Sequence, residues 1–236
     1  MKQNQSPPEP IFSTKEGSWA HSTVAVRLPE ILDRVMAENE YPAKIRENLL
    51  TLKGEIPEGH IRGLREDSGP DLESWRKYIS PWVGKDWLNV PWFFVEHYFY
   101  RRILSAVDYF QTGQDPFFHQ KQQGFWQSQE AIQAYGKTLD HWSRTDLSGP
   151  RMLREGILRS LWGNQADLSL WPAGSEKSPD HQDLRALKSH LLADQSAEII
   201  RLLSRRSAAK NKLALLLDNA GMDLVSDLAL VDILLG

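Results

Sequence analysis

The sequence contains no cysteine. This absence excludes disulfides, thiolate zinc sites, cysteine nucleophiles and thiol-based redox sensing. An excess of positive charge is missing as well, because 28 Lys and Arg residues stand against 31 Asp and Glu residues, for a net charge of −3. No basic field is therefore present that would attract nucleic acid or an anionic membrane surface. We expect a protein without a nucleic-acid partner, in a reducing compartment such as the cytoplasm.

Long hydrophobic runs are also absent. Hydrophobic residues make up 41% of the 236 residues, but no stretch approaches the roughly 20 consecutive apolar residues that a membrane-spanning helix needs. The N-terminal residues MKQNQSPPEP lack the apolar segment of a secretory signal. We therefore expect no membrane association, and we interpret residues 1–11 as a disordered lead-in.

The common catalytic signatures are missing too. No phosphate-binding loop, dinucleotide-binding glycine motif, nucleophile elbow or HExxH zinc motif occurs in the chain. The seven histidines are scattered without the spacing of metal ligands, and we interpret each as an ordinary surface or core residue. Nine tryptophans give the chain a high aromatic content, which is more typical of a core than of a surface that stacks on bases.

Two segments in the first half of the chain have apolar residues at helical spacing. Residues 23–36 predict a helix, with Pro29 at a kink or at the junction of two helical pieces; a strand over residues 23–28 is the alternative. The aromatic segment that follows Pro91 predicts a second helix. Its buried face would consist of Trp92, Val95, Phe99, Ile103 and Ala106, and its polar line of His97, Arg101, Ser105 and Asp108.

Further patterns complete a helical region that we place at residues 12–206. Residues 54–70 contain several glycines and prolines among charges, and predict a loop. A helix is expected over residues 149–161, ended by Gly163. A long amphipathic pattern then leads from Leu184 through Leu187, Leu191, Ile199 and Leu203 to Arg206.

The character of the chain changes in residues 207–236. Leu213–Leu217 is an unbroken apolar run, as expected of a strand that is buried on both faces of a parallel sheet. It ends in Asp218-Asn219-Ala220-Gly221, and a helix with Asp223 and Asp227 in its first turns is expected to begin near Gly221. The sequence thus predicts a strand, loop and helix, and open α/β sheets bind ligands at the carboxyl ends of such strands.

Asp218 and Asn219 are the strongest local candidates for chemistry. Carboxylate and amide oxygens are hard ligands that suit Mg²⁺ or Mn²⁺, with waters completing the octahedron. Because Asn is neutral, a metal held by this pair would keep a net positive charge that could bind a phosphate. The alternative is purely structural, since both residue types are favoured as caps of a following helix.

Four segments, in this order, resemble the DUF89 damage-control phosphatases. FSTKEGSWAHSTVAVRLPEIL resembles the family's N-terminal helices, and WLNVPWFFVEHYFYRRIL with the later DPF resembles its aromatic helix. LWGNQADLSL resembles its WxNxxDLS element, and LLLDNAGMDLVSDLALVD resembles its metal-site signature, a strand that ends in Asp-Asn-(Ala/Ser)-Gly before a helix with further acids. The resemblance runs from about Phe12 to the last residue, and it is to the branch that includes a protein once described as an acidic-residue methyltransferase.

The resemblance implies a fold and an activity. Members have a helical N-terminal region on a Rossmann-like three-layer α/β/α domain, so we expect a mostly α chain with the start of that α/β domain at residues 207–236. They hydrolyse sugar phosphates and damaged phosphometabolites with Mn²⁺, Mg²⁺ or similar divalent ions such as Co²⁺ and Ni²⁺. By this resemblance Asp218 and Asn219 are catalytic metal ligands, whereas Asp223, at a position that is usually Glu in the family, and Asn164 and Asp167 bind the substrate. Packing or loop capping is the alternative role for Asn164 and Asp167.

Two features of the family are missing from the sequence, namely the third metal-binding acid and the Arg-Thr-x-Lys substrate motif. Arg144-Thr145-Asp146-Leu147 shares two letters with that motif but precedes the metal signature instead of following it. We therefore expect the chain to be the front portion of a longer domain or a truncated gene product. Two other functions stay open, methyl transfer from S-adenosylmethionine to protein carboxylates and a non-catalytic helical interaction module. The substrate, the choice of metal and the oligomeric state are open as well.

Overall fold

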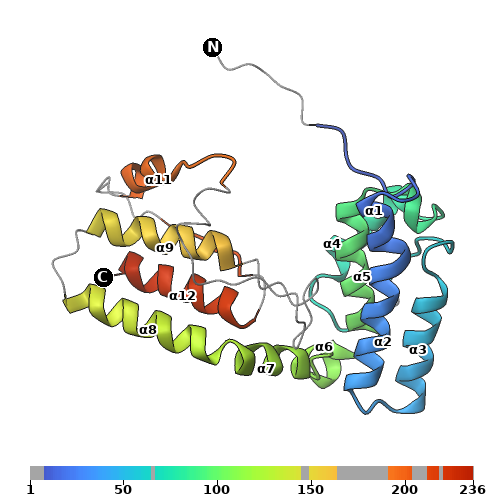
Figure 1. Cartoon of the computed structure of the whole chain (residues 1–236). Helices are drawn as coiled ribbons and strands as arrows, with labels where there is room; N and C mark the ends of the chain where they lie inside the picture. Colours follow the sequence, from blue (N-terminus) through green and yellow to red (C-terminus); the bar gives the residue numbers. More distant parts are fainter. Residues whose placement is uncertain are drawn as a thin grey trace. The chain divides into compact units, whose positions relative to one another are not determined.

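The computed structural model describes residues 8–64, 67–144, 149–163, 191–203, 212–217 and 220–235. Within these ranges the chain is mostly helical, as expected, and contains no β-strand; its extended pairings there are two isolated bridges, Phe12–Pro91 and His60–Asp86. The helices belong to two compact units, residues 1–119 and 120–236 (Figure 1). No helix in the described ranges is long and apolar enough to cross a bilayer.

The N-terminal unit is built around one long aromatic helix, α5 (Trp92–Ala106), which lies against α3 (Ala43–Gly54), the short helix α6 (Tyr109–Thr112) and the turn η1. Its remaining elements are α1 (Trp19–Ser22), η1 (Thr23–Arg27), α2 (Leu28–Glu38), α4 (Leu72–Ile79), η2 (Ser80–Trp82) and η3 (Trp87–Asn89). α3 ends at Gly54, and residues 55–64 and 67–70, which lead to α4, form no helix. The loop predicted over residues 54–70 is therefore confirmed for the described residues after Gly54.

The predicted buried face of α5 is confirmed. Val95, Phe99 and Ile103 are all fully buried, and Trp92 and Ala106 pack against the same core. Tyr98, on the next row of the helix, places its ring centroid 5.2 Å from that of the buried Trp87. Aromatic rings thus supply much of the core of this unit. The interpretation of the tryptophans as core residues is confirmed only in part, because Trp87 is fully buried and Trp75, Trp82 and Trp92 pack against the core, whereas Trp19 and Trp126 are exposed.

The expected junction at Pro29 is also found. One turn of π-helix, η1, joins α1 to α2, and Pro29 stands in the first turn of α2. Proline has no N–H to donate, and its ring collides with the carbonyl four residues earlier, so a regular α-helix cannot pass through this position undisturbed. A widened turn before the proline accommodates the ring. The alternative of a strand over residues 23–28 is wrong.

Arg101 is buried, although it belongs to the polar line of α5. Its side chain is only 3% exposed and donates hydrogen bonds to Asp67 and Asp71, both in the segment that precedes α4. Its guanidinium group also lies 4.5 Å from the centre of the Phe110 ring. Arg101 and Ser105 therefore attach the loop after α3 to the helix, whereas His97 and Asp108 of the same polar line are exposed.

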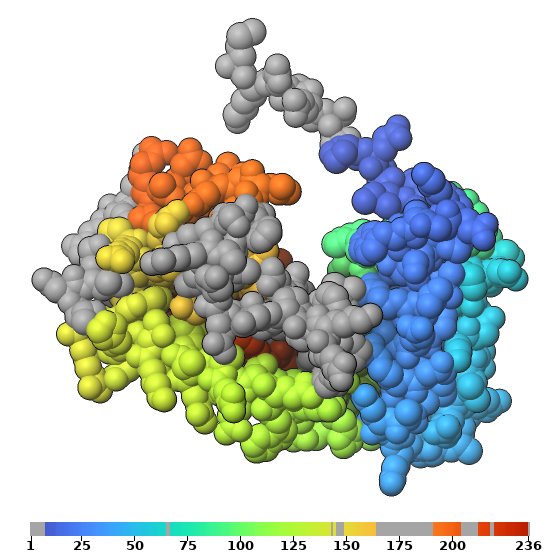
Figure 2. Space-filling model, in the orientation of Figure 1, coloured from blue at the N-terminus to red at the C-terminus, as the bar shows by residue number. Residues whose placement is uncertain are grey.

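The C-terminal unit consists of α8 (Gln129–Arg144), α9 (Gly149–Gly163), α11 (Ser196–Leu203) and α12 (Met222–Leu235), and α7 (Phe118–Gln127) contains the boundary between the units. Figure 1 shows α12 between α8 and α9, and both contact it. α8 and α11 are visible at the surface of this unit in Figure 2. The helices expected over residues 149–161 and from Gly221 onwards are thus confirmed, and their ends differ from the prediction by only one or two residues.

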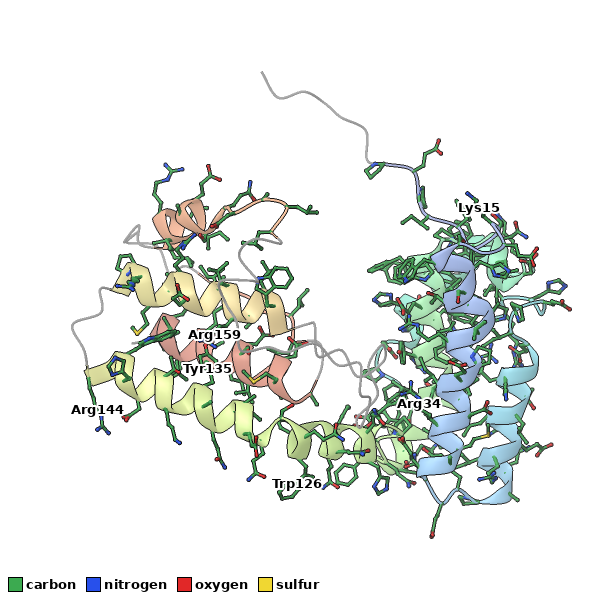
Figure 3. All side chains as sticks on the ribbon, viewed as in Figure 1. Lys15, Arg34, Trp126, Tyr135, Arg144 and Arg159 are labelled. Carbon is green, nitrogen blue, oxygen red and sulfur yellow. The ribbon has the colours of Figure 1, made fainter. Side chains whose placement is uncertain are left out.

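A small core joins α8 to α12. The buried residues Tyr135, Met222 and Ala229 form its centre. Arg159 of α9 lies beside Tyr135 (Figure 3), with its guanidinium carbon 4.6 Å from the ring centroid. Burial raises the pKa of the Tyr135 hydroxyl to about 12. The phenol therefore stays protonated at neutral pH.

Two expectations for the later part of the chain are tested within the described residues. The first is wrong, because the apolar run Leu213–Leu217 has no regular secondary structure and the Leu216 side chain is 92% exposed. A strand inside a parallel sheet pairs with a neighbouring strand along its edges and is covered on both faces. No partner strand occurs in the described ranges. The amphipathic pattern is confirmed for Ile199 and Leu203, which lie in α11; this helix begins only at Ser196, where Asp194 accepts the backbone N–H of Ser196 across 3.0 Å. Leu191 precedes the helix, and Leu184, Leu187 and Arg206 lie outside the described residues.

Candidate functional site

The site predicted from the sequence is described in part. Asp218 and Asn219, the candidate metal ligands, lie outside the described residues, and so do Asn164 and Asp167. Asp223 is described, together with the residues on either side of these gaps, Gly163 at the end of α9 and the turn at Ala220 and Gly221. The candidate site is therefore built from the first turns of α12 and the last turns of α9.

Gly221 begins this arrangement with a backbone conformation that favours glycine. Its φ is +85°, in the left-handed region where a Cβ is strained. Its carbonyl oxygen accepts the N–H of Val225 across 3.2 Å, so Gly221 stands at the N-terminal boundary of α12. The glycine of the Asp-Asn-Ala-Gly sequence thus has a structural reason, because it turns the chain into the helix.

Asp223 lies in the first turn of α12 and is almost completely buried, at 3% exposed. An acidic group in the first turn is favoured by the helix dipole. The end of α9 covers it. A Cβ built on Gly163 would lie 2.7 Å from Asp223 Oδ1 and 3.0 Å from its Cα, so the two residues are in direct contact.

One turn further along α12, Asp227 is held by a side chain of α9. The Ser160 hydroxyl donates to Asp227 Oδ1 across 2.6 Å, and Asp227 is 7% exposed. Asp223 and Asp227 are four residues apart and therefore share one face of the helix. That face lies against α9, so the two carboxylates are held close to the chain that leads into the WxNxxDLS element.

The sequence indicated the acids but not their supports. Asp223 and Asp227 were expected in the first turns of the last helix, whereas the contact of Gly163 and the hydrogen bond of Ser160 are tertiary features. Gly163 carried one signal, since it stands within the LWGN segment that resembles the family element. Within the described ranges no group of three or more His, Asp or Glu side chains is placed to hold a metal ion.

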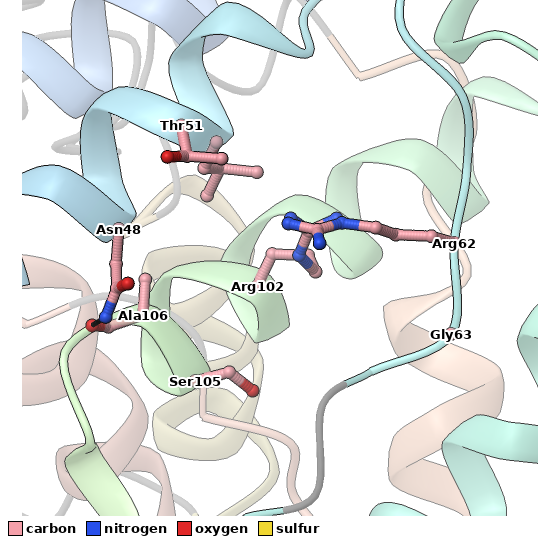
Figure 4. A pocket seen from close by; sticks show the side chains of 8 residues that line it. Asn48, Thr51, Arg62, Gly63, Arg102, Ser105 and Ala106 are labelled. Carbon is pink, nitrogen blue, oxygen red and sulfur yellow. Dashed lines mark hydrogen bonds between the residues drawn. The ribbon is translucent and has the colours of Figure 1, made fainter.

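A small pocket lies in the N-terminal unit, between α3, α5 and the loop after α3 (Figure 4). Arg62 and Arg102 are its charged lining residues, and both pair with Glu55, at 2.6 Å for Arg62 Nη2 and 2.9 Å for Arg102 Nη2. Arg102 also donates to the Tyr98 hydroxyl across 2.7 Å. Because each guanidinium group has an acceptor, we interpret the pocket as part of the packing between loop and helix. Arg102 and Tyr98 lie within the segment WLNVPWFFVEHYFYRRIL, which resembles the family's aromatic helix, whereas no motif marks Arg62 or Glu55.

Comparison with known proteins gives a consistent result. The family model of the damage-control phosphatase ARMT1-like domain matches residues 23–236. Two proteins named damage-control phosphatase ARMT1, from Danio rerio and Homo sapiens, are 31% and 32% identical to the chain over 269 and 279 residues. Both alignments cover 97% of this chain and 60% of the relative. The chain thus spans about 60% of the length of these relatives.

Proposed function

This chain belongs to the damage-control phosphatase ARMT1-like family, and from that membership we propose that the whole protein is a divalent-metal-dependent phosphatase of small phosphorylated metabolites. Sugar phosphates and damaged phosphometabolites are the proposed substrates, and the cytoplasm is the proposed location. The family expected from the four sequence segments is confirmed. We further propose that residues 12–206 form the helical region and that residues 207–236 begin a Rossmann-like α/β domain.

The observation that carries the proposal is the buried carboxylate of Asp223 in the first turn of α12, directly after the Asp-Asn-Ala-Gly sequence. The donor set before it fits a hard divalent ion, because Asp218 offers carboxylate oxygens and Asn219 an amide oxygen. Carboxylate and amide oxygens do not distinguish Mn²⁺ from Mg²⁺, and both are proposed. Asp218 and Asn219 would hold the ion.

The remaining residues have proposed roles at the substrate. When bound, the metal supplies a Lewis acid at the phosphoryl oxygens. Asp223 would orient an attacking water or a sugar hydroxyl by accepting its proton in a hydrogen bond. Asn164 and Asp167 would bind the substrate from the segment that follows Gly163. The neutral Asn219 leaves positive charge at the site, which favours an anionic phosphate.

A direct assay tests this function. The whole protein is incubated with a panel of sugar phosphates that includes fructose 1-phosphate, with Mn²⁺, with Mg²⁺ or with EDTA, and release of inorganic phosphate is measured. We expect turnover with a divalent metal and none with EDTA. A parallel incubation supplies methyl-labelled S-adenosylmethionine and an acidic protein. Methyl transfer without phosphate release would overturn the proposal in favour of a carboxyl methyltransferase, and neither activity would favour a non-catalytic helical module.

A further inference from the structure

The side of α9 that faces α12 consists of small residues. Gly156, Ser160 and Gly163 stand at positions i, i+4 and i+7, which lie on one face of a helix. A Cβ at Gly156 would meet Ile233 Cδ1 at 2.8 Å and Leu230 Cδ1 at 3.3 Å. Ser160 meets Asp227, and Gly163 meets Asp223. The two helices therefore approach closely along several turns, and the contact changes from apolar at Gly156 to acidic at Gly163.

The contact at Gly163 leaves no room for a side chain. The nearest atoms to its missing Cβ are Oδ1 and Cα of Asp223, at 2.7 and 3.0 Å, and both are at or below the closest distances that Cβ atoms tolerate. Because one of them is backbone, a methyl group here would have to displace the first turn of α12 and not merely a flexible side chain. At Gly156 the nearest atoms are instead the ends of the Ile233 and Leu230 side chains, which can rotate away.

The contact at Ser160 satisfies a buried carboxylate. Burial of a charged group costs free energy unless hydrogen bonds compensate for the lost water. The Ser160 hydroxyl provides such a bond to Asp227 Oδ1 at 2.6 Å, in the turn that follows Asp223. Gly163 and Ser160 thus act on successive turns of the same acidic face.

We propose that Gly163 and Ser160 are positioning residues. Gly163 packs against Asp223 and Ser160 holds Asp227 one turn later, and together they fix the first turns of α12 so that the Asp223 carboxylate has the orientation that the reaction needs. This inference rests on the proposed function for the role of Asp223. The proposed contacts themselves belong to the described residues of the C-terminal unit. Neither residue is proposed to touch the substrate, because both act through α12.

A matched pair of variants tests the role of Gly163 in the whole protein. Gly163→Ala and Gly156→Ala add the same methyl group to the same helix pair, one next to the acids and one next to aliphatic side chains. Turnover of fructose 1-phosphate with Mn²⁺ is measured per folded molecule, and Mn²⁺ affinity is measured by calorimetry. We expect Gly163→Ala to lower kcat by about 10- to 100-fold, as is typical for lost support of a site, while Gly156→Ala keeps kcat and Mn²⁺ affinity close to those of the wild type. Equal losses in both variants would show that α9 is only packing, and would overturn the inference.

Two double-mutant cycles test the contacts without metal or substrate. The denaturation midpoint is measured for Ser160→Ala in the wild type and in an Asp227→Ala background, and for Gly163→Ala in the wild type and in an Asp223→Ala background. In the Asp227→Ala background we expect Ser160→Ala to leave the denaturation midpoint unchanged, because the hydrogen-bond acceptor is gone. In the Asp223→Ala background we expect Gly163→Ala to change the midpoint less than in the wild type, because the side chain that it meets is gone. Strict additivity in both cycles would overturn the inference whatever the activity.

The two kinds of failure are distinguishable. If the wild-type protein releases no phosphate from any member of the panel, the proposed function fails, and the cycles alone decide whether α9 fixes the two carboxylates. If the wild type is active but Gly163→Ala and Gly156→Ala behave alike, the proposed function stands and the positioning role is wrong.

Discussion

Arg101 donates to both carboxylate oxygens of Asp67, from Nη1 to Oδ2 and from Nη2 to Oδ1, each across 2.9 Å. This two-bond geometry is the strong form of an arginine–carboxylate pair. The Ser105 hydroxyl and the backbone N–H of Gly69 donate to the same carboxylate. The hydrogen bonds from Arg101 are the main reason why the pKa of Asp67 is lowered from 3.8 to about 2.

The acid stability of the protein should reflect this pair. A carboxyl group with a lowered pKa in the folded state stabilises fully above its unfolded pKa and loses that contribution as the pH falls through the folded value. We therefore expect the free energy of unfolding to decrease as the pH falls from 3.8 to about 2, because Asp67 becomes protonated. The Asp67→Asn variant should lack this decrease. At neutral pH the variant should be less stable by about 1–3 kcal/mol, because Arg101 is left with fewer acceptors.

Denaturant titrations at a series of pH values measure both effects. Asp33→Asn is the control, because Asp33 forms an ion pair with Lys53 in which both side chains are exposed. An exposed pair contributes about 0–1 kcal/mol. If Asp67→Asn and Asp33→Asn were equally stable at neutral pH, the Arg101 network would not stabilise the fold.

Truncation of Phe99 should strongly destabilise the N-terminal unit. The side chain is fully buried in the face of α5 that forms the core. Phe99→Ala is expected to cost about 3–5 kcal/mol, from lost burial and the cavity that remains. Phe93, six residues earlier on the same helix and 68% exposed, provides the control. Thermal denaturation should show a clear drop for Phe99→Ala and little change for Phe93→Ala, and an unchanged melting temperature for Phe99→Ala would contradict the burial of that face.

Gly221→Ala should destabilise the turn that leads into α12. The positive φ of Gly221 costs an L-residue about 1–2 kcal/mol, and the added Cβ would lie 3.4 Å from the Gly124 carbonyl oxygen. Gly136→Ala within α8, where no atom lies within 4 Å of the added Cβ, should instead be neutral or stabilise by about 0.5–1 kcal/mol. Denaturation midpoints of the two variants should therefore move in opposite directions, and a stabilised Gly221→Ala would contradict the left-handed conformation.

Asp218→Ala should abolish the proposed phosphatase activity while the fold persists. The variant removes the carboxylate, which is the charged member of the Asp218 and Asn219 ligand pair. Mn²⁺ affinity and turnover should therefore fall together. Circular dichroism reports folding, and phosphate release from fructose 1-phosphate with Mn²⁺ reports activity. Asp232→Ala, an exposed acid on α12, should retain both. Wild-type turnover by Asp218→Ala would sink the assignment of the metal site.

The helices that the sequence predicts well are those whose burial follows their periodicity. α5, α9 and α12 each present apolar or small residues at helical spacing, and tertiary packing acts on that same face. α7 and α8 were not anticipated. The glutamine-rich sequence of α7 has few apolar residues, whereas α8 carries apolar residues at helical spacing that were overlooked, Ile132, Tyr135, Leu139 and Trp142. Arg101 shows the converse case, in which a residue placed on a polar line is buried by partners 30 and 34 positions away in the chain.

The apolar run at Leu213–Leu217 illustrates another reason for error. Its composition predicts a buried strand, but a strand is completed by its neighbours and not by its own residues. The candidate site divides in the same way. Local motifs identify Asp218, Asn219 and Asp223, whereas the support of Ser160 and Gly163 depends on how α9 approaches α12. The small residues Gly156, Ser160 and Gly163 recur at helical spacing in α9, but this pattern does not identify α12 as the helix that they face.

The contact between Gly163 and Asp223 also limits how this sequence can diverge during evolution. A substitution at position 163 that adds a side chain collides with Asp223 unless the helix that carries it moves. Homologous lineages that replace the glycine should therefore carry a compensating change in the first turn of the last helix. The two positions, far apart in the gene, should mutate as a linked pair, and drift at one should be rare while the other is unchanged.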